Sequence, residues 1–453
     1  MIKILKIMPE EDKVIPSVKV ETDKEEKIET SSQLSNQVDD RLLSIPAGVS
    51  GEFQFPEGFL WGTSTSSYQI EGGVTNDWSE WESSEKRKTF LESKKLKKED
   101  YSCGSACNFW THYGDDFDLA KNLNTNAIRF GIEWARIETE NDVWDVEAVK
   151  KYREIFEQAR LRGFRIVLTI WHWTNPTWFA AEGGWAGKNA VMYFDRYSAF
   201  VVKEFGGYID YWVTLNEPMV HIANGYLSGK FPPNRHNIFK ARKAFNNLVK
   251  GHKRAYKNIH LLFPKAKVGI TGLINDFEPA LKWGPLNNLL AKVFHYFWNH
   301  RFLKRIKKYM DYVGLDYYFH DRIICYPPFK KNKNERMTDM GWEIYPKGIY
   351  NVLKYLRRFR KPIIVMENGL ADEHDKYRAA FIKEHLYWVH RAIQEGIDVR
   401  GYFHWSLLDN FEWADGFGPK FGLYTVDRKT FERKIKPSAF VYKRICEENK
   451  LTL

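Results

Sequence analysis

Two glutamates stand where they could carry acid–base chemistry. Glu217 follows the apolar run WVTLN, and Glu367 follows the apolar run PIIVM. Cleavage of a glycosidic bond requires one carboxylic acid that protonates the leaving oxygen and one carboxylate that attacks the sugar or activates water. A single glutamate at a strand end can equally cap a helix or pair with an arginine. Glycoside cleavage is therefore a hypothesis that requires the two side chains to meet in one pocket.

The elements that would position these glutamates alternate regularly from Phe53 onward. Short apolar runs rich in β-branched and aromatic residues predict strands, and the longer stretches of helical period between them predict helices. The expected strands are 60–69, 125–132, 165–171, 211–217, 267–273, 312–318, 362–368 and 399–406, and expected helices include 146–162, 189–205, 238–263, 346–360 and 375–394.

Strands that alternate with helices pair in parallel through right-handed crossovers, and eight such units close a (β/α)8 TIM barrel. The fold class is therefore α/β. In such a barrel the carboxyl ends of all strands meet at one face, which carries the chemistry. We expect Glu217 and Glu367, at the ends of the fourth and seventh strands, to face the same central pocket.

Charge and aromatic content suggest different partners. The chain has 453 residues, a formal net charge of +11 and 16% aromatic residues. A basic surface could bind nucleic acid or an anionic membrane. The densest basic clusters, 301–308 and 357–361, lie on predicted amphipathic helices, so we interpret them as solvated surface and expect no nucleic-acid or membrane partner. The aromatic rings favour a protein that binds flat surfaces such as sugars or bases.

Residues 1–50 differ in composition from the rest of the chain. From residue 9 to residue 50 there is no aromatic residue, and Glu, Lys, Ser, Asp and Gln dominate. Such a segment cannot bury enough apolar surface to fold, so we predict a disordered extension over 1–50 and a single barrel domain over 51–453. The 4 cysteines are too scattered for a disulfide framework or a zinc site, and no apolar run approaches 20 residues. We expect a cytoplasmic protein without a metal.

Characteristic sequence phrases occur in order between residues 53 and 445. They are FPEGFLWGTSTSSYQIEG at 55–72, IRFGIEWARI at 128–137, WHWTNPTW at 171–178, GGW at 183–185, TLNEP at 214–218, GLDYY at 314–318, MENG at 366–369 and GYFHWSLLDNFEWADGF at 401–417. Together they resemble family 1 of the glycoside hydrolases, the β-glucosidase and β-galactosidase family. The resemblance implies that Glu217 is the acid/base, that Glu367 is the nucleophile, and that the product retains its configuration. Sequence spacing alone leaves the stereochemistry open.

The same resemblance implies roles for further residues, and no cofactor. Arg129 would keep Glu367 anionic, Asn216 would bond the 2-hydroxyl of the sugar, and Trp405 would stack beneath the ring. Amides, imidazole and carboxylate suit hydroxyls, which both donate and accept, and an indole face covers apolar C–H groups. The remaining expected contacts to the glycone, the nucleophile or the leaving-group side are Gln69, His172, Tyr318, Trp342, Glu412 and Trp413. Trp134, Trp173 and Trp178 are interpreted as barrel packing.

Two features depart from the family pattern. The phrase GLDYY places Asp316 where the family has an asparagine. An ionised aspartate cannot donate a hydrogen bond, and it would raise the pKa of the carboxyls around it or stay protonated itself. We expect Asp316→Asn to move the acidic limb of the pH–rate profile. The link 274–311 also lacks a long excursion, as does the stretch after Glu367, so we expect a more open aglycone side.

Alternative functions stay open on the sequence. The phrase NFEWADGF resembles that of family members acting on unphosphorylated sugars, and this resemblance implies that Glu412 would bond O4 and O6 and would repel a 6-phosphate. It favours an exo-acting enzyme for β-D-glucosides, and also for β-galactosides and β-fucosides. A 6-phospho-β-glycosidase comes second. A catalytically silent barrel that binds a sugar or a protein partner comes third, and Asp316 is the only sequence feature that favours it. The sequence leaves the oligomeric state open.

Overall fold

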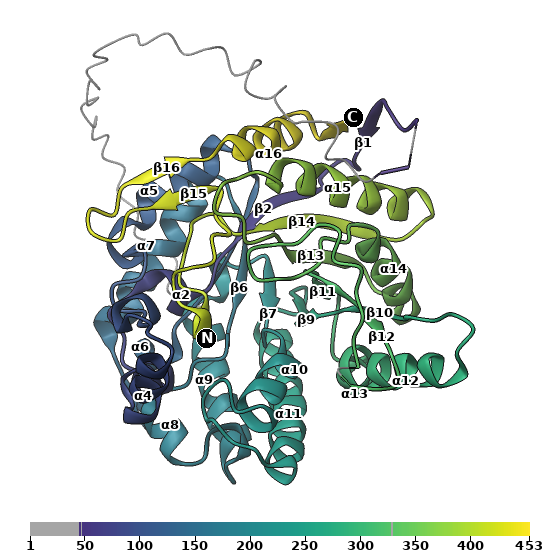
Figure 1. The fold of residues 1–453 in the computed structure, drawn as a ribbon. Coiled ribbons are helices and arrows are strands. Elements are labelled where there is room, and N and C mark those ends of the chain that lie inside the picture. Colours follow the sequence, from purple (N-terminus) through teal and green to yellow (C-terminus); the bar gives the residue numbers. More distant parts are fainter. Residues whose placement is uncertain (1–44, 47, 328) are drawn as a thin grey trace, which may run out of the picture.

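The computed structural model describes residues 45–453 except 47 and 328 (Figure 1). The disordered extension expected for residues 1–50 thus lies outside the described residues as far as residue 44. Strand β1 (Glu52–Gln54) pairs antiparallel with β17 (Lys450–Thr452). Beside this pair, Gly51 and Leu453 exchange two backbone hydrogen bonds of 3.1 Å. The two ends of the described barrel are therefore joined to each other.

A closed parallel sheet forms the centre of the molecule (Figure 1). Its strands are β2 (Leu60–Ser64), β3 (Ala127–Gly131), β6 (Arg165–Thr169), β7 (Tyr211–Val213), β8 (Lys267–Gly269), β9 (Thr271–Leu273), β11 (Val313–Asp316), β13 (Ile363–Asn368) and β14 (Val399–Trp405). Strand β8 pairs with β7, and β9 pairs with β11. Because Ile270 alone separates β8 from β9, these are two halves of one fifth strand that closes the ring. The predicted TIM barrel is confirmed.

Helices cover the outside of the barrel, each through one apolar stripe. In α9, for example, Tyr193, Phe194, Tyr197 and Val201 are buried at helical spacing. The long helices are α5 (Phe109–Asn122), α7 (Val146–Leu161), α9 (Ala190–Phe205), α11 (Ile238–Leu262), α14 (Lys347–Leu356), α15 (Arg378–Gln394) and α16 (Pro437–Glu448). The five helices expected from the sequence all occur, with ends that differ by a few residues.

The first strand is shorter than the sequence predicts. It ends at Ser64, and Ser67–Glu71 form the short helix α2, so the expected strand 60–69 is wrong in its second half. The serines and threonines in this stretch form local hydrogen bonds that compete with a strand, as when Ser66 Oγ donates to Gln69 Oε1 at 2.6 Å. Gln69 is consequently presented to the site from a helix.

Shorter elements fill the loops around the barrel. They are α3 (Asp77–Ser83), α4 (Glu85–Ser93), α6 (Trp134–Ile137), α8 (Thr177–Ala181), α10 (Pro218–His221), β4 (Glu138–Glu140), β5 (Val143–Trp144), β15 (Tyr424–Val426) and β16 (Arg433–Ile435). Among the described residues, no helix combines the length and the apolar character that crossing a bilayer would require.

The link between the fifth and sixth barrel strands builds a separate layer at the edge of the molecule (Figure 1). Strand β10 (Asp276–Pro279) pairs in parallel with β12 (His320–Ile323). Helix α12 (Pro285–His295) packs on this pair, and a π-helical turn, Tyr296–His300, connects it to α13 (Arg301–Ile306). This layer stands beside the barrel strands and forms part of the rim of the site.

Candidate active site

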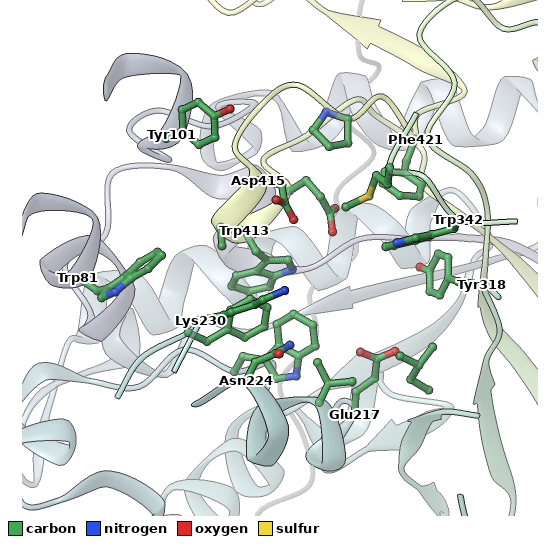
Figure 2. Close-up of a pocket in the computed structure, with 18 of the residues that line it drawn as sticks. Trp81, Tyr101, Glu217, Asn224, Lys230, Tyr318, Trp342, Trp413, Asp415 and Phe421 are labelled. Atoms are coloured by element: carbon green, nitrogen blue, oxygen red, sulfur yellow. The ribbon is translucent and has the colours of Figure 1, made fainter. Parts of the chain in front are cut away.

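A cavity of about 1010 Å³ lies at the carboxyl ends of the barrel strands. Figure 2 shows Glu217, Tyr318 and Trp342 at one side of it and Trp81 and Tyr101 at the other. Sequence-predicted residues that line it are His172, Glu217, Tyr318, Trp342, Glu367, Trp405, Glu412 and Trp413. The remaining four, Gln69, Arg129, Asn216 and Asp316, are fully buried. The contacts described below place these four directly behind the lining, so the structure brings the whole predicted set together.

Both carboxylate oxygens of Glu367 are held by fixed donors. Arg129 Nη1 donates to Oε1 at 2.5 Å, and the Tyr318 hydroxyl donates to Oε2 at 2.7 Å. Arg129 is itself fixed, because its Nε donates to Thr169 Oγ1 at 3.1 Å and its Nη2 donates to Asn216 Oδ1 at 2.5 Å. A buried ion pair with such geometry holds the Glu367 carboxylate in one orientation.

Glu217 occupies a turn between the barrel wall and a helix. Its φ of 41° is left-handed, which is uncommon for a residue with a side chain, and Pro218 begins α10 directly after it. Its backbone N–H donates to the Thr271 carbonyl at 3.1 Å. Burial, and then the nearby Asp316 and Glu367, raise the pKa of Glu217 well above its ordinary value. Glu217 can therefore keep a proton at neutral pH.

Three carboxyl groups meet at the floor of the cavity. Glu217, Asp316 and Glu367 each offer one oxygen, and these oxygens lie within 4.8 Å of one another. Neither oxygen of Asp316 has a hydrogen-bond partner of good geometry among the described residues. Burial and then the charge of Glu367 raise the pKa of Asp316 well above its ordinary value. Within the described part of the chain, this is the one group of three that could present its ligands to a metal ion.

The hydrogen bonds of Asn216 determine which ring nitrogen of His172 carries the hydrogen. Asn216 Oδ1 accepts from Arg129 and also from Thr271 Oγ1 at 2.6 Å, which leaves Nδ2 to donate to His172 Nε2 at 2.9 Å. His172 therefore carries its hydrogen on Nδ1, which is buried and has no partner among the described residues. Burial and Arg129 hold the pKa of His172 well below its ordinary value. A neutral imidazole thus has one free donor for a ligand hydroxyl.

The opposite wall comes from the loop after β14. Gln69 Nε2 donates to the Phe411 carbonyl at 2.7 Å and to Asn410 Oδ1 at 3.1 Å, so this amide braces the loop. Burial, Asp415 and Glu367 raise the pKa of Glu412 to about 8. This pKa favours the protonated form of Glu412 at neutral pH, in which its carboxyl group can donate a hydrogen bond as well as accept one. The repulsion of a 6-phosphate expected from the sequence requires the ionised form.

Indole rings cover this part of the cavity. The Trp413 ring stacks near His172, with centroids 5.6 Å apart and planes at 27°, and Trp405 lies 6.4 Å from the same imidazole. The three rings provide a flat apolar surface beside polar groups, which is the combination that a pyranose ring requires.

Sequence reasoning missed several lining residues. Trp173, which was interpreted as packing, has a φ of 70°, donates to the Asn216 carbonyl at 3.2 Å and lines the cavity. Trp134 does pack, against Tyr197 at 4.5 Å. At the mouth, Leu273, Trp298 and Phe319 line the cavity but lie outside the recognised phrases. Their contribution depends on how the link after β9 folds back, which periodicity does not indicate.

Comparison with known proteins gives consistent matches over nearly the whole described chain. The model of glycosyl hydrolase family 1 matches residues 52–312 and 298–451. Beta-glucosidase A of Thermotoga maritima is 32% identical over 88% of this chain and 99% of its own length. A beta-galactosidase of Saccharolobus solfataricus is 30% identical, covering 88% of this chain and 96% of its own.

Solved structures agree with these matches. The beta-glycosidase from Pyrococcus horikoshii superimposes with a TM-score of 0.80 at 38% identity, covering 89% of this chain and 97% of its own. The beta-glucosidase from Thermotoga maritima in complex with glucoimidazole gives a TM-score of 0.81 at 30% identity, with coverage of 87% and 99%.

Proposed function

Since the chain belongs to glycosyl hydrolase family 1, we propose that it is a retaining, exo-acting β-glycosidase for terminal β-D-glucosides, and also for β-galactosides and β-fucosides. One observation carries the proposal. Glu217 and Glu367 offer oxygens within 4.8 Å of each other. Glu217 has a raised pKa that favours its acid form, whereas Arg129 and Tyr318 hold the Glu367 carboxylate, which is the difference that an acid and a nucleophile require. Retaining enzymes hold their two carboxyl groups about 5–5.5 Å apart, whereas inverting enzymes leave room for a water at about 6.5–9.5 Å.

In the first step, Glu367 attacks the anomeric carbon while Glu217 gives its proton to the leaving oxygen. The bond from the anomeric carbon to that oxygen breaks, and an ester bond to Glu367 forms. Arg129 and Tyr318 hold the attacking carboxylate in place, so little reorganisation is needed at the moment of reaction. The raised pKa of Glu217 keeps the required proton available.

In the second step, Glu217 takes a proton from water, the water oxygen bonds to the anomeric carbon, and Glu367 leaves as a carboxylate. The charge of Glu367 is one cause of the raised pKa of Glu217. That charge disappears while Glu367 is esterified, so Glu217 becomes more acidic after the first step. It therefore changes from proton donor to proton acceptor when the second step requires a base.

Recognition of the glycone would rest on the polar groups around this pair. Asn216 and the Nδ1–H of His172 would bond hydroxyls next to the anomeric carbon, and Glu412, on the loop that Gln69 braces, would bond the far side of the ring. Trp405 and Trp413 would cover the apolar faces of the ring. A relative named for glucosides and another named for galactosides support a site that accepts both sugars.

The test compares wild type, Glu217→Ala and Glu367→Ala on the 4-nitrophenyl β-glycosides of glucose, galactose and fucose. We expect turnover by wild type, with the β-anomer as the first product in an NMR time course. Each variant should lose activity, by on the order of 10⁴-fold for the nucleophile. Glu373→Ala, on an exposed loop, is the matched control and should be unaffected.

Other outcomes would redirect the proposal. The α-anomer as first product would refute retention. Turnover of 6-phosphoglycosides alone would make the phosphoglycosidase alternative correct, and a folded protein without any turnover would indicate a silent barrel.

A further inference from the structure

Helix α12 presents its apolar side to solvent. Its two buried residues are Asn287 and Ala291, which lie on the inner side. Large apolar side chains occur instead on the outer side, at the three- and four-residue spacing of one helical stripe. This α12 stripe consists of Leu286 (64% exposed), Leu289 (59%) and Val293 (40%) on the helix, together with Trp283 (82%) in the turn before it and Phe297 (50%) in the π-helical turn after it. A surface helix of a globular protein ordinarily turns such a stripe inward.

The orientation of α12 is fixed by contacts on its inner side. Asn287 Oδ1 accepts a hydrogen bond from the Cys325 backbone N–H at 2.9 Å. In the following turn, Asn299 and Asn275 exchange two hydrogen bonds of 2.8 and 3.1 Å, and Trp298 Nε1 donates to the Leu273 carbonyl at 2.9 Å. Rotating the helix to bury the stripe would break these bonds. The apolar residues are therefore held outward by the fold.

The segment that carries the stripe has charged side chains of a single sign. Between Glu278 and Asp311 the chain contains no Asp or Glu and seven Lys or Arg residues. They are Lys282, Lys292, Arg301, Lys304, Arg305, Lys307 and Lys308, and all except Arg301 are exposed. An apolar stripe on a segment whose exposed charges are all cationic suits a partner that is apolar beneath an anionic surface.

We propose that α12 docks on the surface of an anionic lipid bilayer. The stripe enters the boundary between headgroups and acyl chains, with Trp283 at the depth that tryptophan favours, and the lysines contact the headgroups. Docking of two copies through this segment would bring two sets of cations together without any acidic side chain of the segment between them, which opposes a symmetric dimer. The proposal departs from the solvated surface inferred from sequence, because periodicity does not reveal which side of α12 faces the protein.

Docking would also place the site at the membrane. Trp298 directly follows the stripe residue Phe297 and lines the cavity together with Leu273. The mouth of the cavity would therefore open near the lipid surface. Membrane docking needs no glycosidase activity, so the docking proposal and the proposed reaction are tested independently.

The test is co-sedimentation of the full-length protein with sucrose-loaded vesicles. Pure phosphatidylcholine is compared with phosphatidylcholine that contains about one third phosphatidylglycerol, over a series of salt concentrations. We expect binding to the anionic vesicles alone, and binding that weakens as salt rises. The test variants are a stripe variant, Leu286→Ser/Leu289→Ser/Val293→Ser, and a charge variant, Lys304→Glu/Lys307→Glu/Lys308→Glu.

The matched controls replace exposed leucines and exposed lysines that lie outside α12 and α13. Leu161 and Leu261 are 78% and 79% exposed, and Lys94, Lys95 and Lys97 are exposed too. We expect each test variant to lower the partition coefficient at least about tenfold. The control variants, Leu161→Ser/Leu261→Ser and Lys94→Glu/Lys95→Glu/Lys97→Glu, should bind like wild type.

Several results would overturn the assignment. These are no binding by wild type, binding that survives in the stripe variant, and equal loss in test and control variants. A dimer in light scattering that the stripe variant abolishes would show that a second copy, not a bilayer, covers α12. Melting curves of all variants exclude unfolding as the cause, since every substituted side chain is exposed.

Discussion

The two sides of the cavity are built on different principles. On the glycone side, the buried residues Arg129, His172, Asn216 and Glu367 are joined by direct hydrogen bonds, and Arg129 alone contacts three other side chains. On the mouth side, the half-buried Leu273, Trp298, Phe319 and Trp342 meet mainly through apolar surfaces, such as the rings of Phe319 and Trp342 at 5.1 Å.

This difference separates two tasks. Where bonds break and form, positions must be held closely, and a connected buried network of hydrogen bonds does this. Where a variable leaving group is only covered, apolar rings can adapt to several shapes. Substitutions on the glycone side should therefore mainly lower kcat, whereas substitutions on the mouth side should mainly raise KM.

The largest expected effect is on the glycone side. Arg129→Met removes the cation that orients Glu367, so kcat should fall on the order of 10²–10³-fold. It also leaves a carboxylate buried without its partner, which should lower the free energy of unfolding by about 3–5 kcal/mol. Steady-state kinetics and thermal melting measure both quantities.

An ion pair outside the cavity lining provides the control. Arg322 bonds both carboxylate oxygens of Glu343 at 3.2 Å, yet neither residue belongs to the glycone side. Arg322→Met should leave kcat nearly unchanged. If both arginine variants reduced kcat equally, the distinction between the two sides would be lost.

Asp316→Asn should change how the glycone side responds to pH. The negative charge of Asp316 is one cause of the raised pKa of Glu217. Without it Glu217 loses its proton at lower pH, so the alkaline limb of kcat/KM should move to lower pH. The acidic limb should move as well, as expected from the sequence, because these carboxyls titrate together. An unchanged pH–rate profile would refute a role for Asp316 charge.

The same variant should be more stable than wild type at neutral pH. The folded pKa of Asp316 is raised, so the unfolded chain ionises first as pH rises above the unfolded value of about 3.9. Wild type therefore loses stability relative to the variant above that pH. Denaturant titrations should show a gain of at least about 1 kcal/mol at pH 7 that disappears below about pH 4.

A smaller effect is expected from the mouth side. Trp298→Ala should raise KM for aryl glycosides by up to about tenfold and leave kcat almost unchanged, because it removes a contact made equally before and during the reaction. The matched substrate is methyl β-D-glucoside, whose aglycone is too small to reach Trp298. A fall in kcat for both substrates would place Trp298 in the catalytic network.

The smallest expected difference is in the local opening of helices α12 and α14. Helix α12 has two buried residues, whereas α14 buries five of its ten. Backbone amides of α12 should exchange hydrogen faster than those of α14 in native-state exchange followed by mass spectrometry. Equal protection would argue against the more open aglycone side that the short link predicts.

The residues differ in how far sequence could place them. Glu217 and Glu367 follow recognisable strands, and the geometry of parallel barrels then brings them together. Gln69 was expected on a strand but lies on α2, because local hydrogen bonds of serine override the apolar pattern. The outward face of α12 and the position of Trp298 depend on long-range packing against β10 and β12, which no local period encodes.

The neighbours of the two glutamates also bear on how such a protein could change in evolution. Replacing Glu367 leaves Arg129 charged and buried beside a gap, which destabilises the barrel. Replacing Glu217 instead removes one of three crowded carboxyls, and because its raised pKa favours the neutral form, no buried ion is left without its partner. If the proposed roles hold, a lineage that drifts away from hydrolysis can therefore lose Glu217 while remaining well folded and keeping Glu367. Descendants of this barrel with new chemistry would be expected to differ first at position 217.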